Sequence, residues 1–349
     1  MNKLITPFLI LFISTHLNAQ VGGSVTYNFL NLPSSSRIAG VGGIFTSGYD
    51  EDVNLVFQNP AALNNQMNNC LSLNRVAYLA DADYAFAGYA HQFKSLGSLA
   101  IGIQYLNYGD FLETNLIGEV VGKFSANEQS VQIVYARNQN EKLSYGFNLK
   151  LASSRLATYF SSAICVDAGL LYHDSSSGFN ASAVIKNIGT QLTGYTSVKE
   201  KLPFDIEAGV SKKLEHTPFQ ISLNLHHLQQ FNIRYDDPAI SNTASILGDT
   251  STPKEKKYFA DKIFRHAVFG TQIFLGRNLN LSIGYNHIRR QELGFAQRKG
   301  MGGFSFGAAI KVKRFQLGYS HANYDIAGGT DNFSLLINLQ SMFGKHELN

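Results

Sequence analysis

The sequence predicts an all-β protein, a membrane-spanning antiparallel β-barrel of about 14 strands with a short N-terminal hatch segment. Three observations lead to this fold class. Only 15% of the residues are charged, against about 25% in soluble domains. Long segments alternate apolar and polar residues, and short turns alternate with longer connections along the chain.

The composition of the 349-residue chain excludes several other classes of protein. It holds 31 Gly, 17 Tyr and 25 Phe, and 44% of it is hydrophobic. Disordered chains combine low hydrophobicity with high charge, so disorder is excluded. Beyond residue 20 no apolar run approaches the ~18 residues of a membrane-spanning helix. The net charge of +4 is spread thinly, and we therefore expect no nucleic-acid partner.

The first residues have the pattern of a secretory signal peptide. Lys3 supplies the positive charge, residues 4–13 form the apolar stretch, and Leu17-Asn18-Ala19 is a suitable cleavage site. We therefore expect a signal peptide over residues 1–19 and a location in the cell outer membrane. Cys70 and Cys165 lie far apart and in no metal-like spacing. We expect no metal and no cofactor, and a disulfide between the two cysteines stays open.

The following segment, residues 20–70, lacks the strand pattern and contains the start of a helix. Asn59 suits the N-cap and Pro60 the first helical position. A fourteen-strand barrel has a lumen too wide for its wall side chains alone to fill. We therefore expect residues 20–70 to occupy the lumen as a hatch. A periplasmic or linker segment is the alternative.

Residues 71–343 carry the barrel pattern. Strict alternation covers residues 98–105, 143–152, 219–226 and 279–286, and this period of two is typical of strands with one apolar and one polar face. The strands run for about 9–13 residues, close to the ~9–11 of a membrane-spanning strand. Their polar faces hold Gly, Ser, Asn and Gln instead of Lys and Glu, which favours a membrane barrel over a soluble sandwich. Residues 344–349 are then a periplasmic tail.

The connections give an independent count of the strands. Tight turns are expected at residues 94–97, 139–141, 174–177, 214–217, 276–278 and 312–313. They interleave with mostly longer connections if residues 112–124 belong to an external loop and not to a wall strand. Outer-membrane barrels alternate short periplasmic turns with longer extracellular loops. The count is then fourteen, from residues 71–78 to 331–341, with both chain ends on the periplasmic side.

Two motifs resemble a catalytic or a metal site, and the sequence around each of them argues against that function. Ser305 lies in Gly303-Phe304-Ser305-Phe306-Gly307, inside an alternating segment and not at the strand-to-helix turn of a nucleophile elbow. His226 and His227 should point to opposite faces of a strand, so they should not chelate a metal together, and no third ligand is evident. We therefore expect a protein that is not an enzyme.

A basic patch is expected at the outer rim. His287 and Arg289 share one face of a predicted strand, and Arg290 closes that strand. The patch could receive a carboxylate, a phosphate of lipopolysaccharide, or a hatch acid among residues 50–52. A structural ion pair in the lumen is the alternative. Residues 230–262 form the longest connection, which lies outside by parity and is either a partner-binding loop or disordered.

Several short motifs carry a resemblance to known families. Asn59-Pro60-Ala61 after a glycine-rich stretch resembles the hatch of FadL-type outer-membrane barrels. The order of motifs along the chain resembles the PorQ family of the type IX secretion system, in the PorV/PorQ branch. These motifs are Phe29-Leu30-Asn31-Leu32-Pro33, Arg37, Gly40, Gly42, Gly43, Asp52-Val53-Asn54, Asn59-Pro60-Ala61, Phe124-Ser125-Ala126-Asn127, Ser144-Tyr145-Gly146, Ile233-Arg234-Tyr235-Asp236-Asp237-Pro238, Phe264-Arg265-His266 and Tyr285-Asn286-His287-Ile288-Arg289-Arg290.

The resemblance implies a place in a cell-surface attachment complex. Its partners would be a PorZ-like surface protein, the PorU sortase and a PorV-like barrel. That complex removes the C-terminal signal of secreted cargo and attaches the cargo to lipopolysaccharide, and the PorQ-like barrel anchors the PorZ-like protein without catalysis. The first alternative is a FadL-like transporter of hydrophobic small molecules, which needs an apolar path through the lumen. The second is an outer-membrane hydrolase.

Overall fold

The computed structural model describes residues 25–78, 82–93, 97–233, 259–292, 300–325 and 328–339. The expected signal peptide, the periplasmic tail and most of the long connection at residues 230–262 lie outside the described residues. No helix among those ranges is long and apolar enough to cross a membrane.

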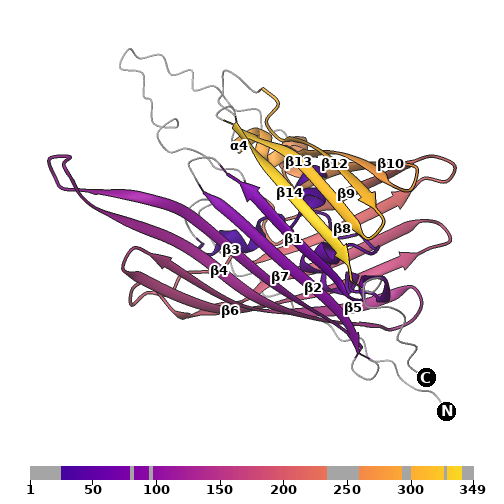
Figure 1. Cartoon of the computed structure of the whole chain (residues 1–349), viewed down its shortest axis with the longest axis horizontal. Coiled ribbons are helices and arrows are strands. Elements are labelled where there is room, and N and C mark those ends of the chain that lie inside the picture. The colour runs from indigo at the N-terminus through magenta and orange to yellow at the C-terminus, as the bar shows by residue number, and fades with distance from the viewer. Residues whose placement is uncertain are drawn as a thin grey trace.

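Fourteen antiparallel strands form one closed barrel, so the predicted fold class and strand number are confirmed (Figure 1). Each strand pairs with its neighbours in sequence, and β1 pairs with β14 to close the wall, with Cys70 opposite Asn338. The strands are β1 (Cys70–Ala77), β2 (Asp83–Phe93), β3 (Gly97–Thr114), β4 (Val120–Asn138), β5 (Leu143–Leu156), β6 (Tyr159–Asp174), β7 (Phe179–Thr193), β8 (Asp205–Lys213), β9 (Phe219–Leu225), β10 (Ala267–Leu275), β11 (Leu279–Asn286), β12 (Phe304–Val312), β13 (Phe315–Asp325) and β14 (Gly328–Asn338).

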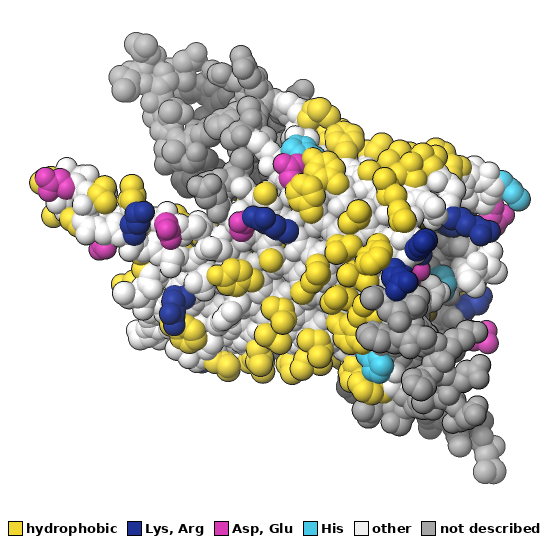
Figure 2. Space-filling view, viewed as in Figure 1, with side chains coloured by type: hydrophobic (Ala, Val, Ile, Leu, Met, Phe, Trp, Pro, Cys, Tyr) yellow, Lys and Arg dark blue, Asp and Glu magenta, His cyan; other side chains and the backbone are white. Residues whose placement is uncertain are grey.

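The two faces of the wall differ as the alternation predicted. On β3, Ile101 and Ile103 are about half exposed, whereas Gln104 is 2% exposed. Apolar side chains accordingly gather over the outer flank of the barrel (Figure 2). The inner face is polar and includes paired charges, such as the buried ion pair between Lys150 and Asp167 at 2.6 Å. Such a surface, apolar outside and polar inside, suits a lipid bilayer.

The connection predicted over residues 112–124 is a strand hairpin and not an irregular loop. β3 and β4 pair through Leu112 opposite Lys123 and end at Thr114 and Val120, beyond the last residue of β2 that pairs with β3, Asp83. This extension projects from the barrel at the end opposite the tight turns (Figure 1). It adds no strand to the wall, so the count of fourteen holds.

The N-terminal segment fills the lumen with short helices. They are η1 (Asn28–Asn31), α1 (Ser36–Gly40), η2 (Val53–Phe57), η3 (Pro60–Ala62) and η4 (Asn65–Met67). η3 begins as predicted, because the Asn59 side chain accepts a hydrogen bond from the Ala61 N–H at 3.0 Å. Apolar hatch residues such as Phe45, Val56 and Phe57 are buried in one cluster with wall residues such as Phe86. The hatch therefore packs against the inner wall.

Among the described residues, two further helices lie in the connections at the outer end. They are α3 (Phe259–Arg265) and α4 (His287–Glu292). α4 corrects the expectation of a strand through residues 287–290. The side-chain oxygen of Asn286 accepts the Arg289 N–H at 3.3 Å, an N-cap bond that favours a helical turn over a continued strand.

Candidate functional site

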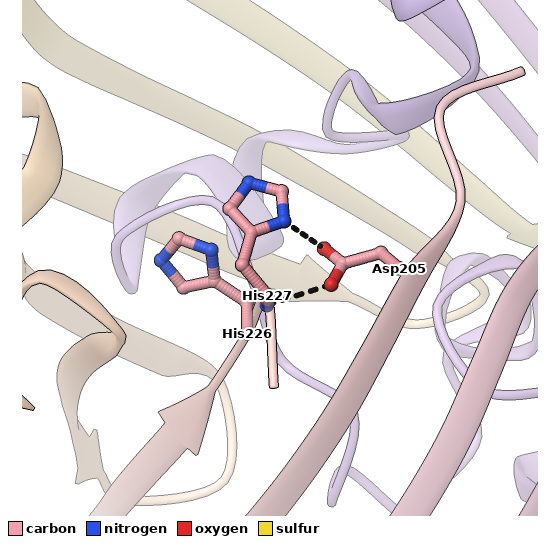
Figure 3. A group of neighbouring side chains, drawn as sticks. All are labelled: Asp205, His226 and His227. Atoms are coloured by element: carbon pink, nitrogen blue, oxygen red, sulfur yellow. Dashed lines mark hydrogen bonds and ion pairs between the residues drawn. The ribbon is translucent and has the colours of Figure 1, made fainter. Parts of the chain in front are cut away.

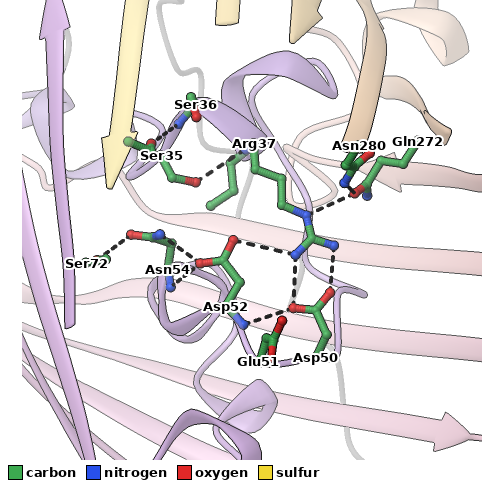
Figure 4. Close-up of polar contacts among 12 residues, drawn as sticks. Ser35, Ser36, Arg37, Asp50, Glu51, Asp52, Asn54, Ser72, Gln272 and Asn280 are labelled. Carbon is green, nitrogen blue, oxygen red and sulfur yellow. Dashed lines mark hydrogen bonds and ion pairs between the residues drawn. The ribbon is translucent and has the colours of Figure 1, made fainter. Parts of the chain in front are cut away.

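Arg37 of α1 is the centre of a polar clamp between hatch and wall (Figure 4). Its guanidinium makes a two-pronged ion pair with Asp50, with nitrogen–oxygen distances of 2.9 and 2.7 Å. It also lies 3.5 Å from Asp52 and donates to Gln272 of β10 at 2.9 Å. The Arg37 side chain is 9% exposed, and such a buried charge needs this pairing.

The clamp continues across the lumen to the first strand. The Asp52 carboxylate accepts hydrogen bonds from the backbone and side chain of Asn54, at 3.0 and 2.8 Å. The Asn54 side-chain oxygen accepts from Ser72 and Asn74 of β1, both at 2.8 Å. One connected network therefore links β10 to β1 through the hatch.

The pKa values of the two aspartates in the clamp shift in opposite directions. Burial opposes ionisation of Asp50, but the Arg37 guanidinium outweighs it and holds the pKa of Asp50 below its usual value. Burial dominates at Asp52 and raises its pKa above the usual value. Asp50 is therefore the principal counter-ion of Arg37.

The other residues of the hatch motif lie close against the wall or against α4. The Gly40 carbonyl accepts a hydrogen bond from Ser305 of β12 at 3.1 Å. Gly43 has φ +94° and lies against the Arg289 guanidinium, where a side chain would collide. Asn59 lies against Gly169 of β6.

Pro60 and Ala61 make the corresponding contacts with β5. The Pro60 carbonyl lies against Gly146, where a Cβ would come within 2.5 Å of it. The Ala61 carbonyl accepts a hydrogen bond from Ser144 at 2.7 Å. Ser305, which contacts Gly40, lies within the strand β12. It is therefore not at the strand-to-helix turn of a nucleophile elbow.

The structure arranges the predicted basic patch differently from the sequence expectation. His287, Arg289 and Arg290 lie on the helix α4, so the strand argument that placed His287 and Arg289 on one face does not apply. The acid beside His287 is Asp261 of α3, at 3.0 Å.

The hatch acids pair elsewhere. Asp50 and Asp52 lie beside Arg37, and Glu51 forms an ion pair with Lys311. Asp261 also pairs with Arg265 at 2.9 Å. The ion pair of His287 therefore joins α3 to α4 at the outer end of the barrel and does not reach the hatch.

A cluster that the sequence interpretation rejected lies where β8 begins and β9 has ended. Asp205, His226 and His227 each offer one ligand atom, and these atoms lie within 4.8 Å of one another (Figure 3). β9 ends at Leu225, and His227 has φ +55°. The rule that neighbouring residues point to opposite faces therefore fails here, and Asp205 is the third group that the sequence did not reveal.

Burial controls the charge of this cluster. The carboxylate of Asp205 accepts the His227 backbone N–H at 2.6 Å, and its other oxygen lies 3.2 Å from His227 Nδ1. His226 is 4% exposed, and burial lowers its pKa to about 3. At neutral pH the His226 ring is therefore uncharged, with a lone pair on one nitrogen.

The projecting β3–β4 hairpin exposes apolar side chains beyond the barrel rim. Leu112 is 59% exposed and Ile117 is 80% exposed, and Leu116 at the tip is fully exposed. The rings of Phe111 and Phe124 stack across the hairpin with centroids 5.2 Å apart. Exposed apolar side chains gathered on one projection make it a candidate interaction surface.

Comparison with known proteins identifies the fold. No protein-family model and no curated protein sequence matches the chain. Among solved structures, the Ralstonia pickettii toluene transporter TbuX is 11% identical, with a TM-score of 0.51 over 89% of this chain and 98% of that one. A deltaS2 mutant of the monoaromatic hydrocarbon channel TodX is 12% identical, with the same TM-score and coverage. A Pseudomonas aeruginosa FadL homologue is 7% identical, with a TM-score of 0.47 over 87% and 98%.

These likenesses define a class by fold alone. The chain shares its closed barrel fold with TbuX and TodX. Fold does not determine function, so the role of the chain has to be argued from its own residues.

Proposed function

We propose that the chain is an exported outer-membrane protein whose filled barrel anchors a surface protein of the type IX secretion system. The partners are a PorZ-like surface protein, the PorU sortase and a PorV-like barrel. The barrel supports removal of the cargo's C-terminal signal and attachment of the cargo to lipopolysaccharide, and it catalyses neither step. The ordered sequence motifs that resemble the PorQ family support this proposal.

The observation that carries the proposal is the hydrogen bonding of the hatch to the wall on several sides. Wall side chains bond hatch backbone from widely separated strands of the barrel. They are Ser144 to Ala61, Asn180 to Ser47, Asn286 to Gly42, Ser305 to Gly40 and Ser334 to Ser36. A lumen held in this way suits a rigid anchor, because opening a wide path would break many buried bonds together.

The projecting hairpin supports the anchoring role from outside. It holds Leu112, Leu116 and Ile117 clear of the wall, on two paired strands that are continuous with the barrel. A partner that covered this apolar surface would be fixed to the membrane through β3 and β4.

A transporter of hydrophobic small molecules is the second candidate. It is favoured by the fold shared with TbuX and TodX, whose names describe a toluene transporter and a monoaromatic hydrocarbon channel. Against it, the cavity of about 350 Å³ beside the clamp is lined by charged groups, including Arg37, Asp50, Glu51 and Lys311. Such a lining does not favour an apolar solute.

Deletion of the chain from its host separates the two candidates. If it anchors an attachment complex, cargo is released unattached or retains its C-terminal signal, and complementation with the full chain restores attachment. If it is a transporter, cargo attachment stays normal and uptake of a radiolabelled aromatic hydrocarbon falls. Normal attachment with reduced uptake would reject the anchoring proposal.

A further inference from the structure

We propose that Asp205, His226 and His227 form a binding site for one divalent transition-metal ion of the zinc class. This site is independent of the anchoring role, and neither the hatch clamp nor the hairpin contributes to it. Two imidazoles and one carboxylate are a ligand set that zinc accepts, with a water molecule completing four-coordination.

The backbone brings the three groups together from two strands. Asp205 is the first residue of β8, and it pairs with Lys186 of β7 at the end of the ladder between these two strands. His226 and His227 follow directly after β9, the other neighbour of β8. The left-handed conformation of His227, with φ +55°, turns its ring toward Asp205 (Figure 3). Because this is a strained conformation for a residue with a side chain, its presence here is consistent with a functional constraint.

The buried ring of His226 presents Nδ1 to the cluster. His226 is 4% exposed, and Nδ1 lies on the side of the ring that faces His227 and Asp205, whereas Nε2, which has no hydrogen-bond partner, lies on the far side (Figure 3). The neighbouring His266 is different. Its two ring nitrogens face the carbonyl oxygens of His226 and Phe231, at 2.8 and 3.2 Å.

The charges around the site set its chemistry. Lys186 and Glu207 neutralise each other at 2.9 Å, which leaves Asp205 as the anion of the cluster. The charge of Arg289 acts on His226 and opposes any cation, so two neutral imidazoles and one carboxylate must outweigh it. Binding through His227 Nδ1, which lies 3.2 Å from Asp205, requires the neutral ring with its proton on Nε2.

A bound ion would join β8 to the chain that follows β9. The ligand atoms lie within 4.8 Å of one another. They would move closer together, so that each lies about 2.0–2.2 Å from the bound zinc ion. The outer ends of these two strands would then be fixed to each other by coordination in addition to hydrogen bonds.

Zinc titration of the full-length barrel tests the proposal. The protein is purified in detergent with an affinity tag that lacks histidine, treated with a chelator, and titrated with ZnCl₂ by calorimetry. We expect one ion per chain, and at least about tenfold weaker binding in Asp205→Asn, His226→Gln and His227→Gln, since even residues behind the ligands cost 10–100-fold.

His216→Gln is the matched control. His216 is exposed, lies in the turn at the other end of the same two strands and also has positive φ, +60°. Its substitution should leave zinc binding unchanged. Heat-dependent electrophoretic mobility verifies that each variant is folded, and the visible spectrum of wild-type protein with Co²⁺ gives a reading that needs no variant. Absence of saturable binding by the wild type, or equal binding by His226→Gln and wild type, would overturn the proposal.

Discussion

The buried guanidinium of Arg37 shows how one hatch residue depends on its counter-ions. We predict that Asp50→Asn lowers the free energy of unfolding by about 2 kcal/mol. This lies below the 3–5 kcal/mol for breaking a fully buried pair, because the Asp50 side chain is 36% exposed and solvent screens it. Asp52→Asn should cost less than about 1 kcal/mol, since Arg37 keeps its main partner. Urea unfolding in detergent measures both, and equal losses would contradict this ranking.

The same pair predicts a dependence on pH. The pKa of Asp50 is lowered in the folded chain, so its stabilisation is complete above the unfolded value of about 3.9 and is lost as the pH falls below it. The difference in unfolding free energy between wild type and Asp50→Asn should therefore stay constant from pH 8 to 5 and shrink only below about pH 4. A difference that had vanished by pH 5 would show that Asp50 does not hold the charge of Arg37.

Single residues also mark where the sequence could not predict the site. The Asp205–His226–His227 cluster depends on a strand that ends at Leu225 and on the positive φ of His227, and no pattern in the sequence signals either. The helix α4 did have a signal. Asn286 is a favourable N-cap residue, but the alternation of the preceding strand concealed it.

At the scale of elements, β5 provides a test of where the bilayer lies. Leu149 is in the middle of β5 and Leu143 begins it, and their side chains are 40% and 37% exposed. We predict that Leu149→Arg costs ~2–4 kcal/mol and Leu143→Arg ~0–1 kcal/mol. Refolding into lipid vesicles and urea titration give both values. Similar costs at the two depths would exclude a bilayer centred on this strand.

The inner face of β5 cannot serve as the permissive control for that test. An inward position such as Asn148 would tolerate arginine in a water-filled channel. In this barrel Asn148 is fully buried and donates to Gln132 at 2.9 Å and to Asp167 at 3.2 Å. Arginine there should therefore be costly too, which is a consequence of the packed inner face that periodicity alone did not reveal.

The β3–β4 hairpin gives the element-scale test of partner binding. We predict that replacing Leu116 and Ile117 with Ser changes barrel stability by less than about 0.5 kcal/mol, because both side chains are exposed. The double variant should nevertheless lose most of the PorZ-like protein that co-purifies with wild type. Val198→Ser, another exposed apolar residue in a connection, is the control and should retain it. Full retention by the double variant would remove the hairpin from the binding surface.

For the whole molecule, the parity of connections was a better guide than their length. The count of fourteen required residues 112–124 to leave the wall, and the pairing of Leu112 with Lys123 beyond the end of β2 satisfies that requirement. Length alone fails at the connection from Leu156 of β5 to Tyr159 of β6, which is as short as a tight turn but lies at the opposite end. A closed wall constrains parity, whereas nothing physical prevents a short outer connection.

Parity also predicts which end of the barrel faces the outside of the cell. The hairpin tip and the turn between β6 and β7 lie at opposite ends, so an epitope inserted after Gly118 should bind antibody on intact cells, and one inserted after Ser176 should bind only after the outer membrane is permeabilised. Both sites are exposed, so neither insertion should disturb the wall, and heat-dependent mobility on gels verifies this. If only the epitope after Ser176 were labelled on intact cells, the predicted orientation of the barrel would be inverted. It would also place the apolar hairpin on the periplasmic side, where it could not hold a surface protein.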